Sequence, residues 1–417
     1  QEAVDRLPLS VADRQQLKAF IGGDRDYLDG KSLMEKYRYI ESVSYHQFLR
    51  DDVQLSDTCI DILDNRLRVF MGITGGNLSV LEAIYMGSPG LNSMGWLAGV
   101  ANSLLASAAE NSIQIRMFPD GNASIARLLV HKLIPRVAPE MKGVEDVAVS
   151  RFDYTALDDA ASTTRLRLNS TVVGVRETND QRVEVDYVES GAARRVTANH
   201  CVLACYNGII PHLCPQLPQA QKEALAYGVK TPFVYASALL RNGKAFAGLQ
   251  ASLVQCPGQY FQWISAAPTM TTGGYEPPRN TEDPMALFLM GSPTEAPQNG
   301  ETLHDLLRFA RHRVYATGLE EFEQTIRNQL QALLGAQGFD HREAIIAITV
   351  NRISHGYAYE YLALNDPEFP DGQRPNEIGR ARFGRISIAN SDSEARAYMD
   401  AAWDAAWRAV NEQASLA

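Results

Sequence analysis

Apolar residues in the first quarter of the chain follow helical spacing. Residues 1–110 have mostly helical patterns, with a capped start at Ser10 to Asp13. Glycine-rich breaks interrupt this pattern at 72–77 and 87–95. The first break lacks a preceding strand, a Walker lysine and dinucleotide spacing, so a loop is favoured over a phosphate cradle.

The rest of the chain alternates between helical and strand-like patterns. A turn at 119–122 leads into an amphipathic helix that Asn122 or Ser124 can cap. Period-two alternation then predicts a β-meander that ends in a buried strand. This meander covers 166–205; further strands are expected at 233–240, 285–290 and 345–350, and helices at 301–313 and 320–334. The alternation predicts a mixed α/β fold of two or three domains.

Composition excludes several classes of protein. The chain is 45% hydrophobic and 21% charged, which disfavours a disordered or fibrous protein. Its net charge of −10 disfavours a general nucleic-acid binder. The five cysteines form no C-x-x-C pair, so neither a metal site nor a disulfide scaffold is indicated. The most apolar stretch, Met94–Ala109, is too short to span a membrane.

The closing segment carries the clearest signal of cofactor binding. An apolar strand, a polar turn at Asn390 to Asp392 and an Ala-rich helix after Tyr398 form a cradle of backbone N–H groups. Such a cradle suits an anionic cofactor. No Gly-x-Gly-x-x-Gly turn precedes it anywhere in the chain. The expectation is therefore that a first dinucleotide-binding unit was lost, cleaved off or supplied by another chain.

Five segments, in this order and spacing, resemble the flavin-containing amine oxidase superfamily, and more closely its spermidine dehydrogenase-like branch. They are Phe118 to Val130, Arg167 to Val173, Val202 to Asn207, Val350 to Tyr361 and Phe383 to Asp392. The likeness covers nearly the whole chain, beginning after the N-terminal Rossmann-like unit of that family. The sequence departs from the pattern of that branch at two places: Ile353 replaces an aromatic residue, and Ser393 to Arg396 replaces a stretch richer in glycine and alanine. These departures bear on the identity of the substrate more than on the fold.

The resemblance implies a discontinuous FAD-binding Rossmann-like domain of amine oxidase type, missing its N-terminal βαβ unit, and a mixed substrate domain with a helical subdomain. Residues 1–111 and 211–344 would build the substrate domain. Residues 112–210 and 345–417 would build the FAD-binding domain.

The resemblance also implies where FAD would bind. Val172 and Val173 would lie near the adenine, and Asn390, Ser391 and Asp392 near the pyrophosphate and ribityl chain. The helix start at Tyr398 and Met399 would lie near the pyrimidine edge of the flavin ring. There, backbone N–H groups and the helix dipole could stabilise negative charge as the flavin is reduced.

The segment His355 to Tyr361 resembles the stretch that lays aromatic rings against the reacting face of the flavin. Tyr357 and Tyr359 are the candidates for flanking the amine, with a buried structural strand as the alternative. His355 could be an acid/base group, a haem ligand or a structural histidine. Lys230 precedes a strand suited to the lysine that holds a water at flavin N5 in many amine oxidases, although its register is a few positions uncertain.

These implications predict oxidation of a C–N bond of an amine or polyamine: hydride passes to flavin N5 and the imine is hydrolysed. The alternatives are another FAD-dependent oxidase or desaturase, which would need a pocket arginine such as Arg352 or Arg241 for a substrate carboxylate, and a non-catalytic partner subunit. The resemblance further implies haem b bound without covalent attachment, a separate electron acceptor, and a periplasmic rather than cytoplasmic location.

Overall fold

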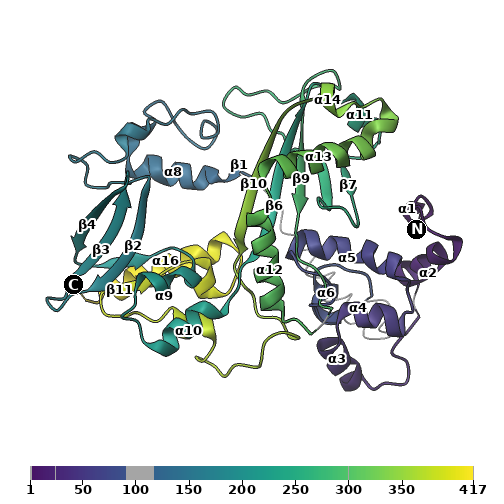
Figure 1. Cartoon of the computed structure of the whole chain (residues 1–417), viewed down its shortest axis with the longest axis horizontal. Coiled ribbons are helices and arrows are strands. Elements are labelled where there is room, and N and C mark those ends of the chain that lie inside the picture. The colour runs from purple at the N-terminus through teal and green to yellow at the C-terminus, as the bar shows by residue number, and fades with distance from the viewer. Residues whose placement is uncertain (1, 24, 91–116, 299, 417) are drawn as a thin grey trace.

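The structure, a computed structural model, describes residues 2–23, 25–90, 117–298 and 300–416 and has the predicted mixed α/β fold (Figure 1). Met94–Ala109 and the end of the glycine-rich break at 87–95 lie outside the described residues. Within them, no helix has the length and apolarity needed to cross a membrane. The five cysteines are free thiols.

The N-terminal region is helical, as predicted. Ser10 caps α2 by accepting a hydrogen bond from the Asp13 backbone N–H. Leu17, Phe20, Phe48 and other apolar side chains from these helices form one buried core. The helices are α1 (Glu2–Asp5), α2 (Val11–Gly22), α3 (Leu33–Ser42), α4 (Tyr45–Gln47) with a π-helical turn at Phe48–Asp52, α5 (Asp57–Met71) and α6 (Val80–Tyr85).

The glycine-rich break after α5 is a structural loop. Asp64 of α5 is buried, and its Oδ1 accepts a hydrogen bond from the Gly75 backbone N–H at 2.5 Å. The same oxygen lies 2.9 Å from Nε2 of His46. These contacts tie the break to two helices, which supports the loop interpretation.

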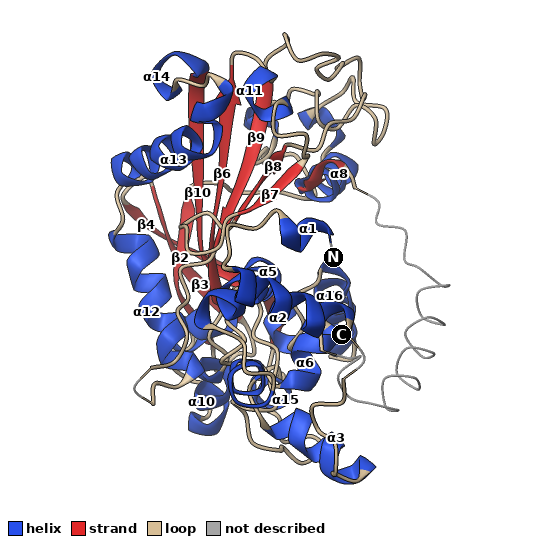
Figure 2. Cartoon of the chain, turned by 90° about the vertical axis from the view of Figure 1, so that its right-hand side faces the viewer, coloured by secondary structure: helices blue, strands red, loops and turns tan. Residues whose placement is uncertain are grey.

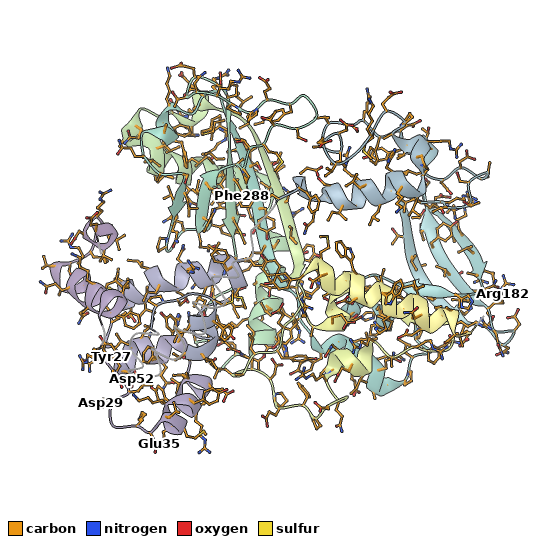
Figure 3. The ribbon with its side chains drawn as sticks, turned by 180° about the vertical axis from the view of Figure 1, so that it is seen from behind. Tyr27, Asp29, Glu35, Asp52, Arg182 and Phe288 are labelled. Carbon is orange, nitrogen blue, oxygen red and sulfur yellow. The ribbon has the colours of Figure 1, made fainter. Side chains whose placement is uncertain are left out.

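A five-stranded antiparallel sheet forms the centre of the molecule, with strand order β10-β6-β9-β8-β7. Phe288 of β9 lies within it (Figure 3). Figure 2 shows α12 and α13 on one side of the strands and α5 on the other. The strands are β6 (Thr231–Leu240), β7 (Leu253–Gln255), β8 (Trp263–Ala266), β9 (Met285–Gly291) and β10 (Ile345–Tyr357), and the associated helices are α11 (Lys244–Ala247), α12 (Leu303–Ala316), α13 (Leu319–Leu334) and α14 (His341–Ala344).

The β10 strand is longer than its sequence pattern predicts. It continues to Tyr357 and pairs with β6 along its length, with a bulge between Ile353 and Tyr357. The central sheet therefore takes β6 to β9 from residues 211–344 and β10 from residues 345–357, which lie on either side of the expected domain boundary.

Five of the remaining strands form two small sheets. The predicted meander is present as β2 (Ser170–Glu177), β3 (Val183–Glu189) and β4 (Ala192–Ala198). The buried strand after it, β5 (Cys201–Leu203), pairs in parallel with β11 (Ile386–Ile388). Around these sheets lie β1 (Pro119–Asn122), α8 (Ala123–Leu133), α9 (Ile210–Leu213), α10 (Gln219–Tyr227), α15 (Pro375–Gly379) and α16 (Met399–Ala414).

The predicted cap of α8 is wrong. Asn122 precedes the helix but its side chain makes no capping hydrogen bond. The hydroxyl of Ser124 is buried and bonds the Asp120 side chain, and it accepts from the Asp120 backbone N–H at 3.2 Å. The Ser124 side chain thus closes the turn before the helix, because it bonds Asp120 in that turn and not a backbone N–H of the first helical turn.

Gly72→Ala is expected to destabilise the fold by about 2–4 kcal/mol. Gly72 ends α5 in the left-handed conformation, with φ +71°. An added Cβ would overlap Thr231 Cγ2 and lie 2.6 Å from Cζ of Phe233, so overpacking adds to the backbone strain. Urea unfolding measures the loss. Gly30→Ala is the control, since Gly30 has φ +84° and open space around it; equal losses at the two sites would contradict this account.

Candidate active site

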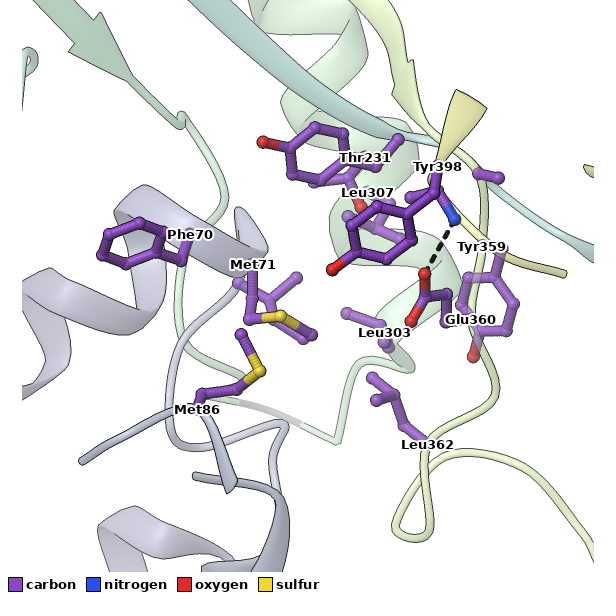
Figure 4. A pocket seen from close by; sticks show the side chains of 14 residues that line it. Phe70, Met71, Met86, Thr231, Leu303, Leu307, Tyr359, Glu360, Leu362 and Tyr398 are labelled. Carbon is purple, nitrogen blue, oxygen red and sulfur yellow. Dashed lines mark hydrogen bonds between the residues drawn. The ribbon is translucent and has the colours of Figure 1, made fainter. Parts of the chain in front are cut away.

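A cavity of about 270 Å³ opens where the helical region, the central sheet and the C-terminal segment meet (Figure 4). Its walls are mostly apolar and aromatic. Among the described residues that line it, Glu360 alone carries a formal charge. The lining residues are Phe70, Met71, Ile73, Met86, Thr231, Leu303, Leu307, Tyr357, Ala358, Tyr359, Glu360, Leu362, Ala397 and Tyr398.

Two of the three predicted catalytic residues line this cavity. Tyr357 ends β10, and its ring lies 4.5 Å from the ring of Phe233. Tyr359 follows two residues later and is buried. The bulge at the end of β10 brings both rings, together with Tyr398 from the start of α16, to one cavity.

Asp366 holds the Tyr359 side chain in place. Its carboxylate accepts hydrogen bonds from the Tyr359 hydroxyl at 2.9 Å, the Tyr227 hydroxyl at 2.5 Å and the Leu362 backbone N–H at 2.7 Å. Burial, together with this carboxylate, raises the pKa of Tyr359 far above its ordinary value. The Tyr359 hydroxyl is therefore a fixed hydrogen-bond donor rather than a base.

Glu360 is the feature of the site that the sequence analysis missed. Its Oε1 accepts a hydrogen bond from the Ala397 backbone N–H at 2.7 Å, drawn as the dashed line in Figure 4. This contact joins the segment after β10 to the residue just before the α16 N-cap. The available sequence signal was a glutamate that directly follows Tyr359, itself two residues after Tyr357.

The start of α16 lies beside the cavity. Tyr398 is the N-cap, and its side chain makes no capping hydrogen bond. The N–H groups of the first turn, beginning at Met399, therefore donate no hydrogen bond to the N-cap side chain, and the helix dipole adds partial positive charge there. Of the predicted pair, Tyr398 lines the cavity and Met399 follows it as the first residue of α16.

The polar turn before α16 makes mainly internal contacts. The Asn390 amide donates to the Cys205 backbone oxygen at 2.5 Å and its Oδ1 accepts from the Ser393 backbone N–H at 2.8 Å. Asp392 pairs with Lys230, and Ser391 is half-buried in the 3-10 turn that follows. These contacts fix the turn and leave backbone groups, rather than these side chains, for a ligand.

Lys230 and Asp392 form a buried ion pair. Lys230 Nζ lies 2.6 Å from Asp392 Oδ1, and the two side chains are only 9% and 10% exposed. The second carboxylate oxygen of Asp392 accepts from the Asn207 backbone N–H at 2.9 Å. This pair connects the start of the central sheet to the C-terminal turn. The neighbouring Thr231, not Lys230, lines the cavity.

The other predicted site residues lie apart from the cavity lining. Val172 and Val173 are exposed on β2. His355 stacks near Tyr206, with ring centroids 4.7 Å apart, and its Nδ1 lies 3.4 Å from the Tyr315 hydroxyl. Burial, followed by the charges of Arg311 and Lys230, lowers the pKa of His355, so the neutral form is favoured. The structure thus separates His355 from Tyr357 and Tyr359.

His304→Phe is expected to make stability less sensitive to acid. The His304 ring packs between Tyr227 and Tyr359, at 5.0 and 4.8 Å, and its Nε2 is buried without a hydrogen-bond partner. Burial lowers the pKa of His304 below 6.5, so below this pH the unfolded chain binds the proton more readily. The native protein therefore loses part of its free energy of unfolding as pH falls. The phenylalanine variant has no such titrating group at this position and should not lose it.

The measurement is urea unfolding of both proteins at pH 8 and pH 5. The variant should match the native protein within about 1 kcal/mol at pH 8, since the unpartnered ring nitrogen gives no hydrogen bond to lose. It should be the more stable protein at pH 5. His312→Phe removes an exposed histidine from the same helix as a control. An unchanged difference between the two pH values would contradict the prediction.

Among the described residues, no group of three or more histidine, cysteine, aspartate or glutamate side chains could hold a metal ion. No protein-family model matches the sequence, and no curated protein sequence matches it.

The fold matches solved structures of amine oxidases at low sequence identity. A triple mutant of putrescine oxidase, made in a redesign of its cofactor binding, superposes with a TM-score of 0.51 and 15% identity over 99% of this chain and 78% of that chain. A single mutant of the same enzyme gives 0.51 and 15% over 99% and 77%. Cyclohexylamine oxidase from Brevibacterium oxydans IH-35A gives 0.49 and 12% over 98% and 76%. The chain therefore has the fold of putrescine oxidase, which supports the mixed α/β architecture expected from the sequence.

Proposed function

We propose that this protein is an FAD-dependent oxidoreductase that oxidises a C–N bond of an amine. The observation that carries the proposal is the cavity itself: a mostly apolar and aromatic chamber that lies beside the start of α16 and has one carboxylate among its described lining residues. The putrescine oxidase fold supports the same conclusion.

The cavity suits an aliphatic amine. Methylene groups can pack against Met71, Leu303 and the other apolar walls, while the tyrosine rings attract a cationic nitrogen through their faces. Glu360 attracts the ammonium group and can take up its proton, so that the amine beside the reacting carbon is neutral. A second amino group, as in a polyamine, is favoured by the further acids Glu41, Asp366 and Glu368 along the groove that adjoins Glu360.

The C-terminal segment fits one part of a flavin. Bound FAD would supply the acceptor for the hydride released from the carbon next to nitrogen. The backbone N–H groups of the N-cap Tyr398 and of Met399 can stabilise negative charge at the pyrimidine edge, and the turn at Asn390 is held rigid for the ribityl chain. Tyr357 and Tyr359 position the amine, and water then hydrolyses the imine. Val172 and Val173 remain candidates for the adenine end.

We further propose that a strand–turn–helix segment from outside residues 1–417 completes the cofactor site. In the described chain, β5 and β11 pair only with each other, although parallel sheets are normally extended and covered on both faces. Val202 of β5 is 42% exposed. On α16, Trp403, Trp407 and Val410 share one helical face and are also exposed. Such apolar side chains favour a covering segment, on a second polypeptide or cleaved from this one.

Oxidation of an amino acid or another carboxylate substrate is the competing proposal. It would require an arginine in the cavity. Arg352 donates to the Thr317 backbone oxygen and Arg241 to the Glu343 backbone oxygen, and neither lines the cavity. The single charge there is negative, which favours a cationic substrate. A non-catalytic partner subunit is the other alternative, and flavin binding distinguishes it.

Haem b, a separate electron acceptor and a periplasmic location rest on the resemblance to the spermidine dehydrogenase-like branch. A Soret band in the native preparation is the expected sign of haem, and dye reduction in the absence of oxygen is the expected sign of a dehydrogenase.

The test of the proposed function is to purify the protein from its native host and assay a panel of monoamines, diamines and amino acids. The expected result is a yellow flavin spectrum, a second polypeptide or fragment in the preparation, and conversion of amines to carbonyl products. Turnover of amino acids but not of amines would overturn the amine proposal.

A further inference from the structure

Within the described part of the chain, the Arg311 guanidinium of α12 has no carboxylate partner. Its Nη2 donates to the Lys230 backbone oxygen at 3.4 Å, and its Nε is buried without a hydrogen-bond partner. No aspartate or glutamate of the described chain lies within ion-pair distance of it, although many other arginines there are paired. A half-buried, unneutralised cation is costly, and proteins commonly retain one to bind an anion.

The surroundings of Arg311 add hydrogen-bond donors and no free negative charge. Tyr206 and Tyr315 lie near it, and burial is the largest cause that lowers its pKa. His355 contacts both tyrosines, through the Tyr206 ring and the Tyr315 hydroxyl. Among the described acids, Asp392 lies near the His355 and Tyr206 side chains, but it is neutralised by Lys230 and accepts from the Asn207 N–H.

This cluster is separate from the amine cavity and open to solvent. None of Arg311, Tyr206, Tyr315 and His355 lines the cavity. Tyr315 is 56% exposed, so a small molecule can reach the group. Lys230 directly precedes β6, and its backbone oxygen accepts the hydrogen bond from Arg311. The next residue, Thr231, lines the cavity.

We propose that Arg311, Tyr315, Tyr206 and His355 form a binding site for a small oxyanion, a carboxylate or a phosphate. The guanidinium supplies a positive charge and, from nitrogens other than its buried Nε, N–H donors for the oxygens of such a group. The tyrosine hydroxyls add donors at its rim. The site does not depend on flavin or on amine oxidation, because it uses neither the cavity nor the start of α16.

The test is calorimetric titration with inorganic phosphate and, separately, with acetate, at constant ionic strength set with chloride. Saturable binding of at least one anion is expected, and the tighter anion identifies the class. Arg311→Gln should weaken it at least tenfold. Arg308→Gln should change it less than twofold, because Arg308 is an exposed arginine on the same helix that pairs with Asp305.

Tyr315→Phe provides a second variant that should fold normally, since this side chain is largely exposed. It should weaken binding about threefold or more through loss of one hydroxyl donor. Binding of neither anion, or equal binding by the native protein and all three variants, would overturn the proposal. If Arg311→Gln does not fold, the Tyr315→Phe and Arg308→Gln results decide it.

Discussion

Glu360→Gln is expected to lower kcat/KM for a primary amine by about 10- to 100-fold. Glutamine has the same shape and can still accept the hydrogen bond from Ala397 N–H, so the contact to the start of α16 is kept. What is lost is the single negative charge in an apolar cavity. Hydrogen bonds to charged groups contribute about 1.5–3 kcal/mol, which corresponds to this range of rates.

Steady-state kinetics with the monoamines of the panel measures this effect. Glu368→Gln is the matched control, because Glu368 is exposed and lies in the adjoining groove but not in the cavity. Its effect should stay within about threefold at physiological salt, where exposed charges are screened. Similar losses in both variants would show that general acidity of the surface, and not Glu360, selects the amine.

Lys230→Met is expected to destabilise the protein by about 3–5 kcal/mol. The substitution removes one partner of a buried ion pair and leaves the Asp392 carboxylate without its cation. Because Asp392 also binds the Asn207 N–H, the loss should loosen the turn that holds the C-terminal segment against β5. Urea unfolding followed by circular dichroism measures the change.

The double variant Lys230→Met/Asp392→Leu should recover part of the stability, since no unpaired charge then remains buried. Lys244→Met is the control for loss of a lysine, because its pair with Glu282 is mostly exposed and should contribute about 1 kcal/mol or less. A loss for Lys230→Met no larger than that of Lys244→Met would contradict the role given to the buried pair.

Local patterns were enough to predict much of the fold. Period-two alternation located the β2–β4 meander and β6, and the serine at position 10 marked the start of α2. These elements depend on interactions between residues that are close in sequence, so the periodicity of the sequence predicts them. The order of the five resemblance segments indicated the fold seen in putrescine oxidase.

The site depended on contacts between residues distant in sequence. Lys230 and Asp392 are separated by 162 positions, and Tyr227 and Asp366 by 139, so no local pattern pairs them. His355 was grouped with Tyr357 and Tyr359 because they are close in the chain. The bulge in β10 instead leaves His355 beside Tyr206 and Tyr315. Its side chain therefore belongs to a different cluster.

The central claim is that this chain binds flavin beside the α16 N-terminus and oxidises amines there. Anaerobic addition of an amine to the protein isolated from its host, followed by absorption spectroscopy, tests this most directly. The account predicts that amines bleach the oxidised-flavin spectrum and that Glu360→Gln slows the bleaching at low amine concentration. A preparation that holds no flavin, or holds flavin that no amine in the panel reduces, would contradict it.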